Sequence, residues 1–155
     1  MGHNLHHNNK KMNKRFILKP EVAGQLGANT IIDTTTMPPI VSNLHYEFDG
    51  WLGDDLLESY PCFICTELLM HRLNKNKFTG CKFDTCEVSK SEIFNQIYQS
   101  KELPVFYWLK VIGSPKDDFY MNGNGDMIVS ERVLSILKDF NINNCEIEEL
   151  LPDGK

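Results

Sequence analysis

The sequence lacks a long hydrophobic run, and its N-terminus has no apolar segment of the kind that a secretory signal needs. It also lacks a glycine-rich phosphate loop and a Gly-x-Ser-x-Gly nucleophile elbow. Only His45 and His71 lie outside the first residues, and neither has a serine or cysteine nearby in a recognisable catalytic pattern. We therefore expect a cytoplasmic protein with no membrane span, no cofactor and no enzymatic activity.

Basic residues are scarce outside the N-terminal segment. The 155 residues contain 16 Lys+Arg and 21 Asp+Glu, which gives a formal net charge of −5. Residues 1–15 hold four of the basic residues and no acidic one, so residues 16–155 carry 12 basic against 21 acidic residues, or −9. This charge argues against a nucleic-acid binder, because phosphate contacts need a basic face, and it suits a basic protein partner.

The first residues differ in composition from the rest of the chain. Residues 1–14 are rich in His, Asn and Lys, and we interpret them as a disordered head or a purification tag. Residues 15–155 are long enough for one domain that folds without disulfides. The five cysteines are an odd number, which fits a disulfide framework badly and indicates free thiols in a reducing compartment.

Short apolar or alternating segments between glycines and prolines predict many strands. The aromatic run 105–112 is interpreted as a central strand covered on both faces. The Asn-Gly-Asn-Gly sequence at 122–125 predicts a hairpin, and residues 55–59 suit one helical turn with Asp54 as its cap. The sequence thus predicts an α+β fold with a mixed or antiparallel sheet and about three helices.

Three segments combine a capping residue with the helical spacing of apolar side chains. Thr66 precedes one such helix, and Ser130 precedes the clearest amphipathic stripe of the chain. Ser89 and Glu92 fit a capping box before a third helix. The expected buried face of that third helix consists of Ile93, Phe94, Ile97 and Tyr98.

The stretches 63–83 and 127–147 align without a gap when the sequence is shifted by 64 residues. Each stretch suits a strand, a hydroxyl cap, a Glu, an amphipathic helix and a strand, and four of the 21 positions are identical. The identical pairs are Ile64/Ile128, Glu67/Glu131, Leu73/Leu137 and Cys81/Cys145. We interpret the pattern as a duplicated strand–helix–strand unit, with units at 40–103 and 104–150. The alternative is that any two strand–helix–strand units look alike.

Four cysteines have the spacing of a four-thiolate zinc site, namely Cys62, Cys65, Cys81 and Cys86. Zinc needs thiolates that converge, whereas strand residues three or five positions apart point to opposite faces. Buried free thiols are therefore the main interpretation. A Cys-rich zinc-binding accessory protein is the alternative function, and a redox pair is a further alternative.

Three groups of acidic and aromatic residues are candidates for binding a protein partner. They are Trp51, Asp54 and Asp55; Asp117, Asp118 and Tyr120; and Glu146, Glu148 and Glu149. An exposed aromatic side chain can anchor a partner, and carboxylates can pair with its Lys and Arg side chains. The alternative is structural, with aspartates that cap helices and turns and aromatic side chains in the core.

The segment 126–140, followed by 146–150, resembles a recurrent phrase near the end of immunity proteins from bacterial polymorphic and contact-dependent toxin systems. The segment 51–57 before 62–67 is similar to the same group, so the resemblance covers roughly residues 44–150. The resemblance implies a non-enzymatic α+β protein of the cytoplasm that binds one cognate toxin domain and blocks it. It implies no catalytic residues.

The charge independently leads to the same hypothesis. Toxin domains that cut nucleic acid need a basic substrate face, which an acidic inhibitor can occupy. We therefore expect an immunity protein that binds a cognate toxin domain and no nucleic acid, as a monomer or weak dimer. A nuclease is the class of toxin that the charge favours.

Overall fold

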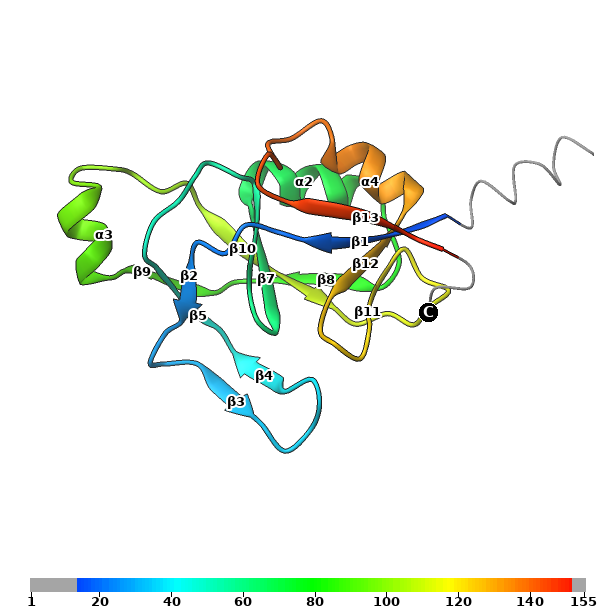
Figure 1. The fold of residues 1–155 in the computed structure, drawn as a ribbon, viewed down its shortest axis with the longest axis horizontal. Helices are drawn as coiled ribbons and strands as arrows, with labels where there is room; N and C mark the ends of the chain where they lie inside the picture. Colours follow the sequence, from blue (N-terminus) through cyan, green and yellow to red (C-terminus); the bar gives the residue numbers. More distant parts are fainter. Residues whose placement is uncertain (1–13, 152–155) are drawn as a thin grey trace, which may run out of the picture.

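The structure is a computed structural model that describes residues 14–151. Within these residues the chain forms 13 strands and three helices, arranged as three sheets and a separate hairpin (Figure 1). The helices are α2 (Glu67–Lys75), α3 (Glu92–Ile97) and α4 (Glu131–Leu137). This arrangement confirms the predicted α+β class with antiparallel and mixed sheets.

The three sheets are named A, B and C. Sheet A has the order β11-β12-β1-β13, with β11 (Phe119–Met121), β12 (Met127–Ser130), β1 (Arg15–Lys19) and β13 (Glu146–Leu150). Sheet B has the order β6-β7-β10-β8, with β6 (Leu56–Ser59), β7 (Cys62–Thr66), β10 (Phe106–Val111) and β8 (Cys81–Asp84). Sheet C consists of β2 (Gly24–Leu26), β5 (His45–Phe48) and β9 (Glu87–Lys90), and the hairpin consists of β3 (Ile31–Asp33) and β4 (Ile40–Asn43).

Sheet B is the central layer of the described chain. One of its faces packs with α2, α4 and sheet A around a first apolar cluster, which includes Leu69 and Leu109. Its other face packs with sheet C and α3 around a second apolar cluster, which includes Tyr46, Phe94 and Trp108. Strand β10 lies between β7 and β8 and sends neighbouring side chains into the two clusters. The predicted central strand covered on both faces is therefore confirmed.

Two of the three predicted helix caps are confirmed. The hydroxyl groups of Thr66 and Ser130 each accept a hydrogen bond from the backbone N–H three residues further on, which satisfies one free donor of the helix. The third cap is Ser91 rather than Ser89, because Ser89 belongs to β9 and lies before the helix begins.

The expected buried face of α3 is wrong for two of its four residues. Phe94 is fully buried and stacks on Tyr98 at a centroid distance of 5.2 Å. Ile93 and Ile97 are 55% and 65% exposed. Phe94 and Tyr98 form one row of residues four positions apart, and Ile93 and Ile97 form a second, parallel row. A helix of only six residues that packs against one sheet edge buries only one of these rows.

Residues 56–59 form a strand rather than the helical turn expected from the sequence. Strand β6 pairs antiparallel with β7. Leu56 belongs to the first cluster and Leu57 to the second, which is the alternation of a strand between two apolar layers.

Sheets A and B share one plan. In each sheet the strand before the helix lies between an edge strand and a central strand, and the strand after the helix forms the other edge. The strand registers also agree. The helix cap Ser130 lies opposite Arg15, the first residue of β1, and the helix cap Thr66 lies opposite Phe106, the first residue of β10. This correspondence describes the present fold, and an origin by duplication stays a prediction.

No helix in residues 14–151 is long and apolar enough to cross a membrane. The interpretation of residues 1–14 as a head or tag concerns residues outside those described, apart from Lys14.

Candidate protein-binding surfaces

The aspartates of the first candidate group form hydrogen bonds within the fold. Asp54 is fully buried, and its carboxylate accepts hydrogen bonds from the backbone N and side-chain Nδ2 of Asn144 at 2.8 and 3.0 Å. Asp55 accepts hydrogen bonds from Thr66 Oγ1 and from the backbone N of Asn141, each at 2.8 Å. The contacts with Asn141 and Asn144 join the segment before β6 to the segment after α4, as the structural alternative expects.

The aspartates of the second candidate group lie in a similar setting. Asp118 accepts hydrogen bonds from the backbone N of Thr79 at 3.0 Å and from Ser130 Oγ at 2.8 Å, and it forms a salt bridge with Arg132. Burial opposes its ionisation, but these contacts outweigh burial and lower the pKa of Asp118. Asp117 accepts a hydrogen bond from the backbone N–H three residues earlier, which lowers its pKa. Both carboxylates therefore stabilise loops of the fold.

Trp51 packs beside the second apolar cluster. Its indole N donates a hydrogen bond to the carbonyl oxygen of Asp54 at 2.9 Å, and its ring meets Phe106 edge-on at 5.9 Å. The ammonium group of Lys101 lies 5.4 Å from the ring centroid. These contacts explain the half-buried indole without a partner, and its role in binding stays a prediction.

Three other candidates, Tyr120, Glu146 and Glu148, come together on one face of sheet A. The strand register places Tyr120 of β11 and Glu148 of β13 at the two ends of one row that crosses all four strands. The outer face of sheet A, as we name it, consists of Ile17, Lys19, Tyr120, Ile128, Glu146 and Glu148. None of its apolar members belongs to either apolar cluster of the described chain.

Strand β13 is an edge strand with exposed acidic side chains. Glu146, Glu148 and Glu149 are all exposed, and none forms a salt bridge with another residue in the range 14–151. Glu149 lies opposite Phe16 and points away from the outer face. Charges on an edge strand also prevent edge-to-edge aggregation, so the acidic edge has a structural use besides binding.

The outer face of sheet A corresponds to a covered face of sheet B. The matching row in sheet B consists of Leu57, Ile64, Trp108 and Asp84. The apolar members of that row are buried in the second cluster, against sheet C. In sheet A, Ile128 is also buried, but Ile17 and Tyr120 are only partly buried. This face is therefore more open than the corresponding face of sheet B.

The cysteines are split between the two faces of sheet B. Cys65 and Cys81 belong to the first cluster, and Cys62 and Cys86 to the second. Cys62 and Cys65 alternate within β7 as predicted, whereas Cys86 lies between β8 and β9 and not in a strand. Burial raises the pKa of Cys62 to about 12 and the pKa of Cys81 and of Cys86 to about 11. Within residues 14–151, no three His, Cys, Asp or Glu side chains form a group that could hold a metal ion. The zinc alternative gains no support from this arrangement.

His45 and Ser89 form a hydrogen-bonded pair that resembles a catalytic dyad, with 2.7 Å between Nε2 and Oγ. However, His45 Nδ1 accepts a hydrogen bond from the backbone N of Asn29 at 3.2 Å. The proton of a neutral imidazole then lies on Nε2, which donates to Ser89 and cannot accept its proton. This pair therefore fastens β5 to β9 and does not activate the serine. His71, 66% exposed, lies 3.8 Å from Glu67 on α2.

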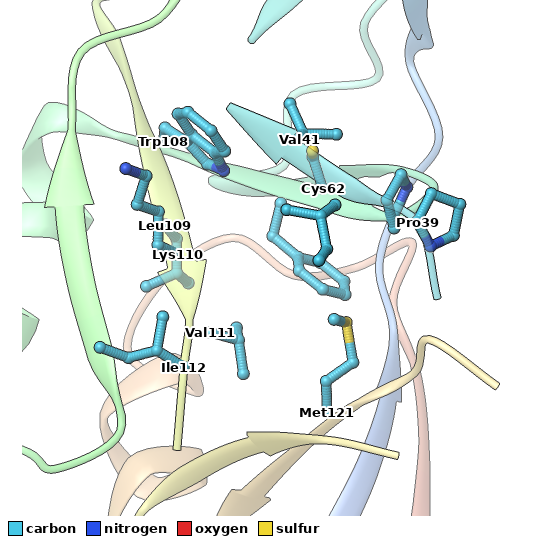
Figure 2. Close-up of a pocket in the computed structure, with 12 residues that line it drawn as sticks. Pro39, Val41, Cys62, Trp108, Leu109, Lys110, Val111, Ile112 and Met121 are labelled. Carbon is cyan, nitrogen blue, oxygen red and sulfur yellow. The ribbon is translucent and has the colours of Figure 1, made fainter. Parts of the chain in front are cut away.

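The β3–β4 hairpin projects from the rest of the described chain (Figure 1) and exposes large apolar side chains. Ile31, Met37 and Ile40 are 61%, 78% and 58% exposed. Between the hairpin and sheet B lies an apolar groove with a volume of about 380 Å³. Figure 2 shows the side chains around this groove. Pro39 and Val41 come from the hairpin segment, and Met121 comes from β11. Trp108 and Lys110 come from β10, and Ile112 follows that strand. Exposed apolar surface of this extent is typical of a protein-binding site.

The hairpin groove has little signal in the sequence. The composition of residues 30–34 is typical of a short strand, but apolar residues in a strand are normally expected to be buried. Only the spatial position of the hairpin, outside both apolar clusters except for Val41, reveals that its side chains are exposed.

A partly buried carboxylate at Glu58 gives a prediction for the pH dependence of stability. Burial, with a further contribution from the charge of Asp126, raises the pKa of Glu58 from 4.5 to about 7. Between these two pH values the folded protein holds a proton that the unfolded chain releases, so this group makes stability fall as the pH rises.

We expect Glu58→Gln to raise the free energy of unfolding at pH 8 by about 1–2 kcal/mol, a value reduced for the partial exposure of the side chain. The variant should also flatten the pH dependence between about pH 4.5 and 7. Urea denaturation at pH 5 and pH 8 measures both effects. Equal slopes for the variant and the original protein would contradict the assignment.

Comparisons with known proteins add no relative. No protein-family model matches the chain, and no curated protein matches its sequence significantly. Two surfaces, the outer face of sheet A and the hairpin groove, are the candidates for binding a partner in residues 14–151.

Proposed function

We propose that this protein is an immunity protein, which binds a cognate toxin domain of a bacterial polymorphic or contact-dependent toxin system and neutralises it by stoichiometric inhibition. The toxin domain is met in the cytoplasm, and a nuclease is the toxin class that the charge favours. The resemblance of the segments 126–140 and 146–150 to that group of proteins supports the proposal.

The observation that carries the proposal is the outer face of sheet A. It combines partly buried apolar side chains, Ile17 and Tyr120, with exposed carboxylates on β13. Such a face suits a basic partner, because apolar contacts supply binding energy while the carboxylates pair with its Lys and Arg side chains. A nuclease must keep a basic face for its substrate, and a protein that covers this face excludes the nucleic acid.

The test uses the toxin domain encoded next to the gene for this chain. Titration of the purified toxin should abolish its activity at a molar ratio of one to one, with a matching complex in size-exclusion chromatography. An association rate that falls with salt concentration would support the electrostatic contribution, and a salt-independent rate would refute that part.

The shape of the titration also separates inhibition from catalysis. A stoichiometric inhibitor leaves residual toxin activity that falls linearly to zero at equivalence. A small amount of protein that inactivates a large excess of toxin over time would instead indicate an enzyme. Absence of any complex with the adjacent toxin domain would overturn the proposed function.

A further inference from the structure

Exposed apolar side chains near the hairpin groove are not confined to the residues that line its cavity. The hairpin also exposes Ile31, Ile32 and Met37, none of which lines the cavity itself. On the opposite side of the cavity, Ile112, which follows β10, is 61% exposed. A small molecule in the cavity would leave the exposed side chains of the hairpin in water, so the apolar surface suits a macromolecular partner.

The base of the hairpin is fastened to the body of the protein. Asn43 Nδ2 donates a hydrogen bond to the carbonyl oxygen of Asn29, and Thr30 Oγ1 donates to the carbonyl oxygen of His45, both at 3.0 Å. Val41 packs against the second apolar cluster. One wall of the groove is therefore held in place before binding, which lowers the entropy cost for a partner.

Lys110 lines the groove, and the neighbouring strand β8 adds a second lysine beside it. Lys110 and Lys82 are cross-strand neighbours, and Asp84 is the single acidic residue of β8 beside them. Lys110 Nζ lies 3.1 Å from an Asp84 oxygen and 4.4 Å from the centroid of the Trp108 ring. Lys82 is exposed and forms no salt bridge with another residue of the described chain. The two lysines beside the groove can accept one further carboxylate.

The groove and the outer face of sheet A lie on opposite sides of strand β11. Met121 lines the groove and packs against the first apolar cluster, and its neighbour Tyr120 belongs to the outer face. Because neighbouring residues of a strand point to opposite faces of the sheet, the groove and the outer face are separate surfaces.

We propose that the hairpin groove seats a large apolar side chain of the toxin domain, and that Lys82 and Lys110 bind a carboxylate close to that side chain in the same toxin segment. The proposal rests on the proposed function and names the part of the toxin that this chain recognises. The anchor supplies affinity, and the adjoining carboxylate supplies specificity.

Affinity measurements with matched variants test the anchor. Ile40→Asp places a charge in the groove at an exposed position and is expected to weaken toxin binding about 100-fold or more. Leu68→Asp is the control, because Leu68 is 74% exposed on α2 and does not line the groove. Its affinity should stay within about 3-fold of the original. Lys82→Glu should weaken binding about 10-fold, whereas Lys75→Glu on α2 should stay within about 3-fold.

Fluorine NMR supplies a readout that does not depend on substitution. The chain has two tryptophans, so 5-fluorotryptophan labelling gives one resonance for Trp108 in the groove and one for Trp51 away from it. Unlabelled toxin domain should shift the Trp108 resonance and leave the Trp51 resonance in place. Binding of Ile40→Asp with the original affinity, together with an unmoved Trp108 resonance, would overturn the groove proposal and leave the immunity function intact.

Two other outcomes have separate meanings. If the adjacent toxin domain forms no complex at all, the proposed function fails and the groove proposal fails with it. If the Trp108 resonance shifts with protein concentration in the absence of toxin, a second copy of this chain occupies the groove, and the proposal is wrong.

Discussion

Asp54→Ala is expected to lower the free energy of unfolding by about 2–4 kcal/mol, because it removes a buried carboxylate that accepts two hydrogen bonds from Asn144. The carboxylate is fully buried, and the backbone N of Asp54 also donates a hydrogen bond to Glu21 at 3.3 Å. The substitution therefore disturbs a joint between segments that are 90 residues apart in the sequence. Denaturant unfolding followed by circular dichroism measures the loss.

A double-mutant cycle with Asn144→Ala shows whether this pair carries the effect. The two substitutions share the hydrogen bond that Asn144 Nδ2 donates, so their combined cost should be smaller than the sum by about 1–2 kcal/mol. Glu148→Ala, at an exposed position, should change stability by no more than about 0.5 kcal/mol. If Asp54→Ala unfolds like the original protein but loses toxin binding, Asp54 is a partner contact and its buried role is wrong.

The parts of the fold that were predictable depend on local chemistry. A hydroxyl before a helix caps it within three residues, so Thr66 and Ser130 could be recognised from the sequence. The hydrophobic run of β10 likewise identified a covered strand. The failures at α3 and at residues 56–59 arose where the face that is buried depends on which distant strand lies alongside.

The candidate binding surfaces depend on longer-range pairing. Strand β1 inserts between β12 and β13, which brings Ile17 into one row with Tyr120 and Glu148. No spacing in the sequence indicates this insertion, because the paired residues are more than 100 positions apart. The aspartates also could not be assigned from the sequence alone. An aspartate can bind a partner or cap a turn, and only its hydrogen-bond partners in the fold distinguish the two roles.

Sheets A and B differ in what covers their corresponding faces. The two sheets share strand order and register, yet sheet C covers the face of sheet B that corresponds to the outer face of sheet A. A toxin domain on the outer face would take the position that sheet C has in the other half. The carboxylates that matter for binding are then those that point to this side, Glu146 and Glu148, rather than the total charge of the chain.

Reversal of these two charges tests that conclusion. The double variant Glu146→Lys/Glu148→Lys is expected to lower the association rate constant with a basic toxin domain by about 10- to 100-fold at low salt. The dissociation rate should change less, because exposed charges act mainly during encounter. Stopped-flow fluorescence at several salt concentrations measures both rates, and the salt dependence of association should become weaker in the variant.

Two controls separate the face from the overall charge. Glu92→Lys/Glu102→Lys changes the net charge equally at exposed positions near α3, far from β13 in Figure 1, and should alter association only slightly. Glu149→Lys changes the same strand on its opposite side and should affect the rate less than Glu148→Lys. Equal effects of all these variants would mean that net charge alone steers the toxin. The outer face of sheet A would then lose its assigned role, while inhibition of the toxin could still stand.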